Sequence, residues 1–192
     1  MSVRESQDTR LRLLQHARDL YLESGPERFS LREVARRSDV SAAAVYRHFD
    51  GKEALLRAVC EEGLRVFSSY LLRALKETTS LERLRAAGDM YRRFGIENPR
   101  DYRVIFMSTP GEDVDVGSSA TFQFLVDRVS ECIKAKALAR GDGLEIAAVI
   151  WAHVHGLVSL RLCGQLAVVG DDDAFTRFFL RSTDRLLKGL AP

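Results

Sequence analysis

The chain has 192 residues and a mass of 21.6 kDa, which suits one large domain or a small domain joined to a larger one. Hydrophobic residues make up 46% and charged residues 29%, so the composition excludes a disordered polypeptide and is typical of a globular protein. The formal net charge of +2 indicates neither a nucleic-acid nor a membrane partner by itself. Any basic binding site must therefore be local.

Several features predict a cytoplasmic protein. Residues 1–8 contain no apolar run, so no secretory signal is expected. The longest uninterrupted apolar run, Ile146 to Ala152, is far shorter than the roughly 20 residues that cross a bilayer, so no membrane span is expected. Cys60, Cys132 and Cys163 are odd in number and far apart, which predicts free thiols and no zinc site. No metal or cofactor is expected.

Apolar residues recur at three- and four-residue spacing along almost the whole chain, which predicts an all-α protein. The expected helices cover residues 8–24, 30–37, 41–49, 50–75, 81–97, 100–107, 119–140, 144–169 and 171–190. Gly25-Pro26 is expected to stop the first helix, and Thr109 to Gly117 is expected to form a mobile loop. The helix from Asp50 is long enough to join a small head to a larger body.

Residues 30–49 match a helix-turn-helix unit. Ser30 and Glu33 have the spacing of a capping box, in which the Ser hydroxyl and the Glu carboxylate each accept from the other residue's backbone N–H. Ser41 is predicted to cap the next helix, and Asp50 with Glu53 repeats the box for the long helix. Only a few residues separate the first two of these helices, which is the length of a helix-turn-helix corner.

The helix after Ser41 has an unusual outer surface. At 100° per residue, Val45 and Phe49 fall on one face and are expected to be buried. The opposite face carries Ala42, Ala43, Tyr46 and Arg47. Small residues flanked by hydrogen-bond donors suit the DNA major groove, which is about 12 Å wide and accepts one α-helix.

Lys52 is the second indication of DNA binding. It lies in the first turn of the long helix, where the helix dipole disfavours a cation unless an anion such as a phosphate binds there. Tyr46 and His48 lie close by and can donate to neighbouring phosphates. Taken singly, each of these residues has an ordinary structural explanation, but together on a helix-turn-helix unit they favour DNA contact. Residues 1–52 contain ten Lys and Arg and eight Asp and Glu, so the chain's net charge lies in this segment.

The segment Ser30 to Leu56 resembles the DNA-binding head of the TetR family of bacterial transcriptional regulators, above all in the pattern Tyr46-x-His48-Phe49-x-x-Lys52-x-x-Leu55. The resemblance covers about residues 7–67 and implies a ligand-binding and dimerisation domain at 68–192. It implies a homodimer, most simply a repressor, that binds a palindromic operator in double-stranded DNA and is released by a small, largely apolar effector. By position, it implies phosphate contacts at Ser30, Tyr46, His48 and Lys52 and a base-reading face of Ser41, Ala42, Ala43 and Arg47.

Two departures from the family pattern bear on this interpretation. Many relatives have Gly at position 39, where this chain has Asp39, but Asp tolerates a left-handed turn better than most residues. Relatives often have a polar or basic residue at position 42, whereas Ala42 offers only a methyl group. Sequence specificity is therefore expected to depend on Arg47 and on DNA shape.

The last two helices are candidates for the dimer interface. On the helix from Leu144, small residues allow a close approach; they are Gly156, Ser159 and Gly164. The last helix carries an apolar stripe of Phe175, Phe178, Phe179, Leu186 and Leu187. His153 and His155 point about 200° apart on a helix, so they cannot ligate one metal ion. Trp151-x-x-x-His155-Gly156 resembles a motif in the regulatory domain of one TetR subgroup.

A set of aromatic and Met residues fits either a simple core or the wall of a ligand pocket. Its members are Phe67, Tyr70, Met90, Tyr91, Phe94, Phe106, Met107, Phe122 and Trp151. The family resemblance favours the pocket, with His155 as a further lining residue.

Two other functional classes are weaker. An enzyme is not supported, because G-x-S-x-G, H-E-x-x-H and the Gly-rich nucleotide-binding motifs are all absent from the sequence. A helical adaptor for a protein partner explains the body but not Tyr46, His48 and Lys52. The sequence therefore predicts a non-enzymatic DNA-binding regulator.

Overall fold

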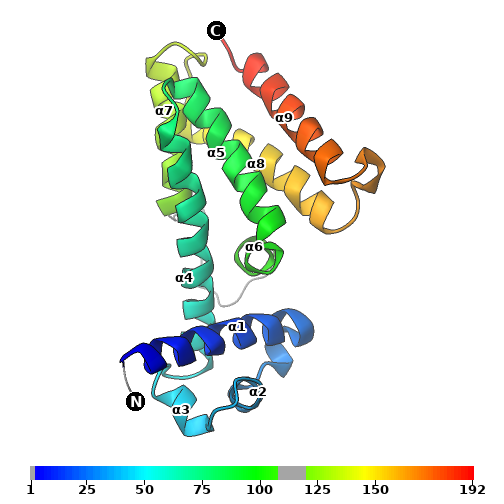
Figure 1. Cartoon of the computed structure of the whole chain (residues 1–192). Coiled ribbons are helices and arrows are strands. Elements are labelled where there is room, and N and C mark those ends of the chain that lie inside the picture. Colours follow the sequence, from blue (N-terminus) through cyan, green and yellow to red (C-terminus); the bar gives the residue numbers. More distant parts are fainter. Residues whose placement is uncertain (1–2, 108–119) are drawn as a thin grey trace. The chain divides into compact units, whose positions relative to one another are not determined.

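A computed structural model describes residues 3–107 and 120–192, which are helical and contain no β-strand (Figure 1). The all-α prediction is confirmed. The structure divides into two compact units, each with its own core. We call the described residues of Met1–Arg65 and Arg100–Val114 the head, and those of Val66–Pro99 and Asp115–Pro192 the body.

The head is built from helices far apart in the sequence. They are α1 (Val3–Arg28), α2 (Leu31–Arg37), α3 (Ala42–Tyr46), the first part of α4 (Lys52–Leu71) and α6 (Pro99–Phe106). Fully buried Leu13, Val34, Val45 and Leu55 meet in its core, and Val104 of α6 joins them. The sequence predicts a body that runs from residue 68 to residue 192. Instead, α6 packs in the head, because its apolar side completes the core there.

A left-handed residue forms the corner between α2 and α3. Asp39 has φ 53°, and its backbone N–H donates to the carbonyl of Arg36 while the N–H of Val40 donates to that of Ala35. These two bonds define a Schellman motif, with Asp39 in the position that Gly usually takes. The carbonyls at the end of α2 are thereby satisfied, and Val40 packs against the head core.

Two helices end earlier than predicted for the same reason. Lys136 (φ 57°) ends α7 (Ala120–Lys134) and Gly164 (φ 75°) ends α8 (Gly143–Leu162), each with the same pair of backbone bonds. The predicted ends at Arg140 and Val169 are wrong. Lys rarely adopts a left-handed conformation, so the sequence did not predict that α7 ends here. Gly164, which the sequence predicts to allow close helix packing, lies in the turn after α8.

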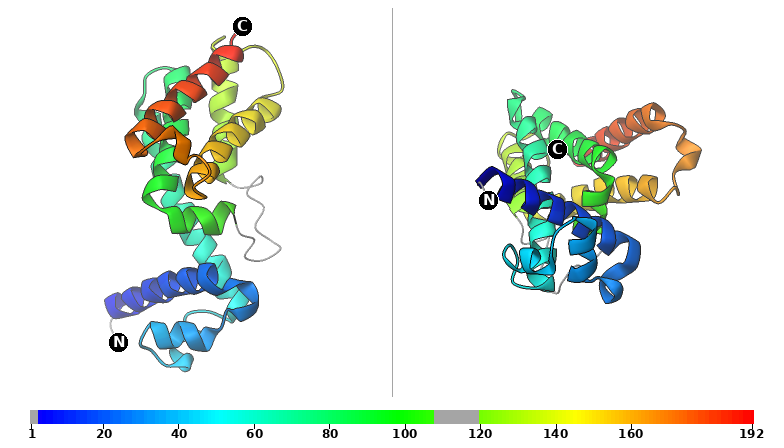
Figure 2. Two further views of the ribbon diagram at one scale, coloured as in Figure 1. Left: turned by 90° about the vertical axis from the view of Figure 1, so that its right-hand side faces the viewer. Right: turned by 60° about the horizontal axis from the view of Figure 1, so that its bottom comes forward.

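The body combines α5 (Ser80–Glu97), α7, α8 and α9 (Asp172–Gly189) with the short 3-10 helices η1 (Leu72–Lys76) and η3 (Ala167–Val169). Helices α8 and α9 form a hairpin (Figures 1 and 2). The long helix α4 was expected to reach Leu75, but it ends at Leu71 and tightens into η1. Thr109 to Gly117, the predicted loop, lies outside the described residues.

The predicted capping box at Ser30 is wrong. The Ser30 side chain makes no capping bond, and the Glu33 carboxylate binds arginines of α2 rather than the Ser30 N–H. A complete box occurs at α5, where the Thr79 hydroxyl accepts from the Glu82 N–H at 3.2 Å and the Glu82 carboxylate accepts from the Thr79 N–H at 2.9 Å. The predicted Ser41 cap is present, accepting from the Ala44 N–H at 3.2 Å.

Helix α8 differs from the sequence expectation in another way. By length and composition it is apolar enough to span a bilayer, although no uninterrupted apolar run is long enough. Only 22% of its most apolar window is buried within the chain, and Leu144, Val149 and Leu160 are exposed. Large exposed apolar patches occur where proteins associate with another protein or with a membrane, so this face is a candidate interaction surface.

The Asp39 corner leads to a stability prediction. Replacing Asp39 with Val places a β-branched residue in the left-handed region and should lower the free energy of unfolding by about 1–2 kcal/mol relative to Asp39→Gly, which has no Cβ. Urea denaturation of the two variants measures the difference. Equal unfolding free energies would contradict the strain assigned to this corner.

Candidate nucleic-acid interface

Burial of one side of α3 determines its exposed surface. Val45 is 0% exposed and Phe49 5%, and both pack in the head core. The predicted outward residues Ala42, Ala43 and Arg47 are exposed, and Tyr46 is 60% exposed. The structure thus places the proposed base-reading residues together on one accessible face. Ser41 is exposed as well, but its hydroxyl serves as the cap of α3.

Lys52, the first residue of α4, has a local partner that the sequence did not reveal. Its Nζ donates to the carbonyl of Pro26 at 2.5 Å and lies 5.8 Å from the centre of the Phe29 ring. This carbonyl at the end of α1 accounts for a cation at a helix N-terminus. An ammonium carries three donors, so Lys52 retains donors for a phosphate while it also links α4 to α1.

The other predicted phosphate contacts differ in accessibility. His48 is half-buried, and its Nε2 is fully buried without a hydrogen-bond partner, so this nitrogen cannot reach a phosphate without a movement of the ring. The ring instead lies against Phe49, 6.3 Å between centres. Ser30 is half-buried, and its side chain makes no capping bond to α2, so the hydroxyl is not committed to capping.

Arg32 is a candidate contact that the sequence analysis missed. It is exposed in the first turn of α2 and forms no ion pair with any described residue. Like Lys52, Arg32 is a cation in the first turn of a helix, where the helix dipole disfavours positive charge. The criterion that singled out Lys52 would have identified Arg32 as well.

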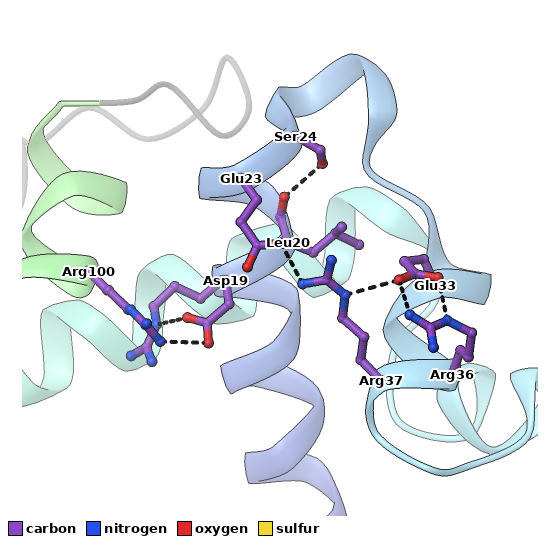
Figure 3. Close-up of polar contacts among 9 residues, drawn as sticks. Asp19, Leu20, Glu23, Ser24, Glu33, Arg36, Arg37 and Arg100 are labelled. Carbon is purple, nitrogen blue, oxygen red and sulfur yellow. Dashed lines mark hydrogen bonds and ion pairs between the residues drawn. The ribbon is translucent and has the colours of Figure 1, made fainter.

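The other arginines of α2 are paired. Arg36 forms a two-pronged contact with Glu33, with N–O distances of 2.8 and 2.7 Å, and Arg37 bonds both Glu33 and Glu23 of α1 (Figure 3). The hydrogen bonds from Arg36 and Arg37 lower the pKa of Glu33 from 4.5 to about 2. The carboxylate is therefore ionised at any physiological pH.

A second ion-pair group holds α6 on α1. Arg18 bonds Asp101 at 2.7 Å, and Arg100 bonds Asp19 at 2.8 Å (Figure 3 shows the second pair). Arg18, Asp19 and Asp101 are each only about one-fifth exposed, so these contacts are better shielded from solvent than ordinary surface pairs. Ion pairs to α1, as well as the packing of Val104, therefore hold α6 in the head.

The predicted pocket residues form two groups within the body. Phe67, Tyr70, Tyr91 and Phe94 are buried, with ring centres 4.9–5.7 Å apart in the contacting pairs. Half-buried Met90, Phe122, Trp151 and His155 make up the second group. Trp151 contacts both Phe122 and His155, at 5.5 and 5.8 Å.

A hydrogen bond links the two groups. The Tyr91 hydroxyl lies 3.0 Å from Nδ1 of His155, whose Nε2 lies 3.2 Å from the Ser159 hydroxyl. Burial lowers the pKa of His155 below its ordinary value of 6.5, which favours the neutral ring at neutral pH.

Two predicted pocket residues do not join this set. Phe106 and Met107 belong to the head, where Phe106 packs against Tyr102 with ring centres 5.0 Å apart. An open depression of about 520 Å³ occurs elsewhere, with none of the predicted residues in its lining of Ile133, Lys134, Lys136, Leu138, Arg140 and Pro192.

The predicted dimer residues are only partly at the surface. Phe175 and Phe179 are 0% exposed, so they belong to the core of a single chain and cannot contact a partner. Leu186 packs against the body core, and Ser159 bonds His155. Phe178 is half-buried, and Gly164 is exposed in the turn after α8. A Cβ placed at Gly156 or at Gly164 would meet no atom within 4 Å, so both positions leave room for another chain.

Two family models match the chain. One, described as bacterial regulatory proteins of the tetR family, matches residues 13–59, and the other, a tetracycline repressor-like C-terminal domain, matches residues 84–183. Among curated proteins, the transcriptional repressor Rv3405c of Mycobacterium tuberculosis is 45% identical over 49 residues, or 26% of each chain. The transcriptional activator FasR of Mycolicibacterium smegmatis is 32% identical over 100 residues, or 52% of this chain and 46% of FasR. The chain thus spans less than half the length of these relatives.

Solved structures resemble the whole chain. A protein of unknown function from Rhodococcus sp. RHA1 is 27% identical, covers 96% of both chains and has a TM-score of 0.78. The transcriptional regulator PfmR of Thermus thermophilus is 19% identical over 94% of this chain and 100% of its own, with a TM-score of 0.71, and shares the fold.

The Glu33 cluster leads to a pH prediction. Because the pKa of Glu33 is lower in the folded state, its contribution to stability is present above about pH 4.5 and is lost as the pH falls towards 2. Glu33→Gln should therefore lose less stability than the wild type between pH 5 and pH 3, as measured by urea unfolding. Glu27→Gln, at an exposed carboxylate without an ion pair in the described residues, is the control. A Glu33→Gln profile parallel to that of the wild type would refute the assignment.

Proposed function

The chain belongs to the TetR family of bacterial transcriptional regulators, and we propose on this premise that it is a repressor that binds a palindromic DNA operator as a homodimer. The observation that carries the proposal is the exposed face of α3, where Tyr46 and Arg47 flank two alanines above a buried Val45. Members of this family are not enzymes, and no catalytic role is proposed. A DNA-binding role places the protein in the cytoplasm.

The contacts divide into those that position the head and those that read sequence. Tyr46, Lys52, Ser30 and the additional Arg32 would bind phosphates, together with His48 if its ring turns. Arg47, at the C-terminal end of α3, is the one long donor of the predicted base-reading face. The methyl groups of Ala42 and Ala43 can pack on thymine but cannot make bidentate base contacts.

The homodimer would form through the α8–α9 hairpin. Leu144, Val149 and Leu160 of α8 and Leu180 of α9 are large apolar side chains, each 39–56% exposed. Exposed Ala148 and Ala152, about two turns and one turn before Gly156, allow another helix to approach α8 closely. A second copy that covers this surface supplies the two heads that a palindromic site requires. Gly156 remains in the proposed interface, whereas Phe175 and Phe179 are left out.

The effector would be a small, largely apolar molecule bound in the body. The half-buried Phe122 and Trp151 offer apolar contact, and His155 offers a polar group at the same place.

Two recognition helices in successive turns of the major groove must lie about 34–36 Å apart. An effector that binds better to a dimer with a different spacing would release the operator in proportion to that difference in affinity.

Selection of genomic fragments on the purified protein tests the DNA-binding proposal. A recurrent palindrome is expected in the bound fragments, whereas fragments no more enriched than random DNA would refute it. Arg47→Ala should bind a changed set of sequences, because losing a bidentate base contact costs about 1–3 kcal/mol of discrimination. Arg57→Ala, at an exposed arginine of α4 away from the proposed contacts, should select the wild-type sequence.

The dimer proposal predicts that Ala152→Arg yields a monomer, because it places a charge in the centre of the exposed face of α8. Sedimentation equilibrium measures the assembly state, and operator affinity should fall with it. Ala135→Arg, at the exposed end of α7, is the matched control and should remain dimeric. A dimeric Ala152→Arg protein would exclude this face as the interface.

A further inference from the structure

The C-terminal end of α2 is tied to α1 by one side chain. Arg37, the last residue of α2, donates from Nη1 to the Glu23 carboxylate at 2.7 Å and from Nε to that of Glu33 at 3.0 Å (Figure 3). Glu23 belongs to α1 and lies 14 residues earlier in the chain. The Arg37 side chain is only 27% exposed, so it lies along the surface of the head rather than extending into solvent.

The cluster around Arg37 has no net charge. Glu33 also binds Arg36, so two guanidinium groups share two carboxylates. Arg37 uses Nε and Nη1 on these carboxylates, so a phosphate at its remaining N–H donors would lie beside two carboxylates that already balance the charge of the cluster. Arg32, on the same helix, carries no such partner among the described residues and is the better phosphate ligand.

The link lies where it can control the direction of α3. Arg37 is followed directly by the corner at Asp39, whose Schellman bonds join the end of α2 to the start of α3. Helices of seven and five residues are not stable alone, and α2 also lacks a side-chain cap. Their orientation is therefore set by tertiary contacts, and these include the Arg37–Glu23 pair between α1 and the end of α2.

We propose that Arg37 is a positioning residue for operator recognition. Its pairing with Glu23 holds the end of α2 against α1 and so sets the angle at which α3 meets the major groove, without contact between Arg37 and the DNA. This role rests on the proposed DNA-binding function. It assigns a part in operator recognition to two residues that do not themselves contact the DNA.

The two possible roles of Arg37 predict opposite effects at Glu23. If Arg37 positions α2, Glu23→Gln removes its anchor and weakens operator binding. If Arg37 is instead a phosphate ligand restrained by Glu23, the same substitution releases it and strengthens binding. The sign of this effect thus separates the two roles.

The experiment compares the full-length wild type with Arg37→Gln, Glu23→Gln and the double variant, using the selected operator and random DNA over a range of salt concentrations. Each single variant should bind the operator about two- to fivefold more weakly, which is the range expected for one partly exposed ion pair. The double variant should be no weaker than the weaker single variant, because both changes break the same contact. The salt dependence of binding should stay that of the wild type.

A matched control and a second DNA separate positioning from other causes. Arg32→Gln removes the same charge from the same helix and should reduce the slope of log K against log salt by about 0.9. Binding to random DNA should be unchanged in the Arg37 and Glu23 variants, whereas partial unfolding would weaken both DNAs equally.

The proposal is overturned if Arg37→Gln lowers the salt slope as Arg32→Gln does, if Glu23→Gln tightens binding, or if neither variant changes operator affinity. Equal losses on operator and random DNA overturn it as well. A wild type that binds no operator would overturn the proposed function, whereas the other outcomes overturn only the role of Arg37.

Discussion

The recognition surface depends on the burial of one side of two very short helices. Helices α2 and α3 have seven and five residues, well below the roughly 12–15 residues at which an isolated helix becomes even marginal in water. Val34 and Val45 are fully buried, and they hold these helices against α1 and α4. The same burial leaves the alanines, Tyr46 and Arg47 on the outer side of α3. The candidate DNA surface is thus a consequence of the head core.

Polar contacts add a directional restraint to the apolar packing of the short helices. Apolar burial is non-directional, so it fixes which side of a short helix faces inward more strongly than it fixes the direction of the helix axis. Hydrogen bonds and ion pairs have defined geometry. Three such contacts in this head occur at the ends of helices: Arg37 at the end of α2, the Schellman bonds around Asp39, and Lys52 at the start of α4.

The path of the chain connects the proposed DNA-binding head with the proposed effector-binding body. After α5 in the body, the chain passes through Pro99 into α6, which belongs to the head through Val104 and the Arg18–Asp101 pair. It also passes from head to body within α4, at Arg65. A change in the body can therefore reach the head through α4 or through α6, and α6 is paired to α1, which also carries the Glu23 anchor of α2.

The sequence by itself determined the helical class, the helix-turn-helix unit and the outward face of α3, because each depends on spacing within one short segment. Helical periodicity alone places Val45 inward and Tyr46 outward. Tertiary structure decided the rest: the partners of Glu33 and Lys52, the burial of Phe175, and the packing of α6 in the head. Each of these depends on which distant groups come within a few ångströms, and local periodicity carries no information about that. Where a side chain has several possible partners, as Glu33 has, only the packed fold selects among them.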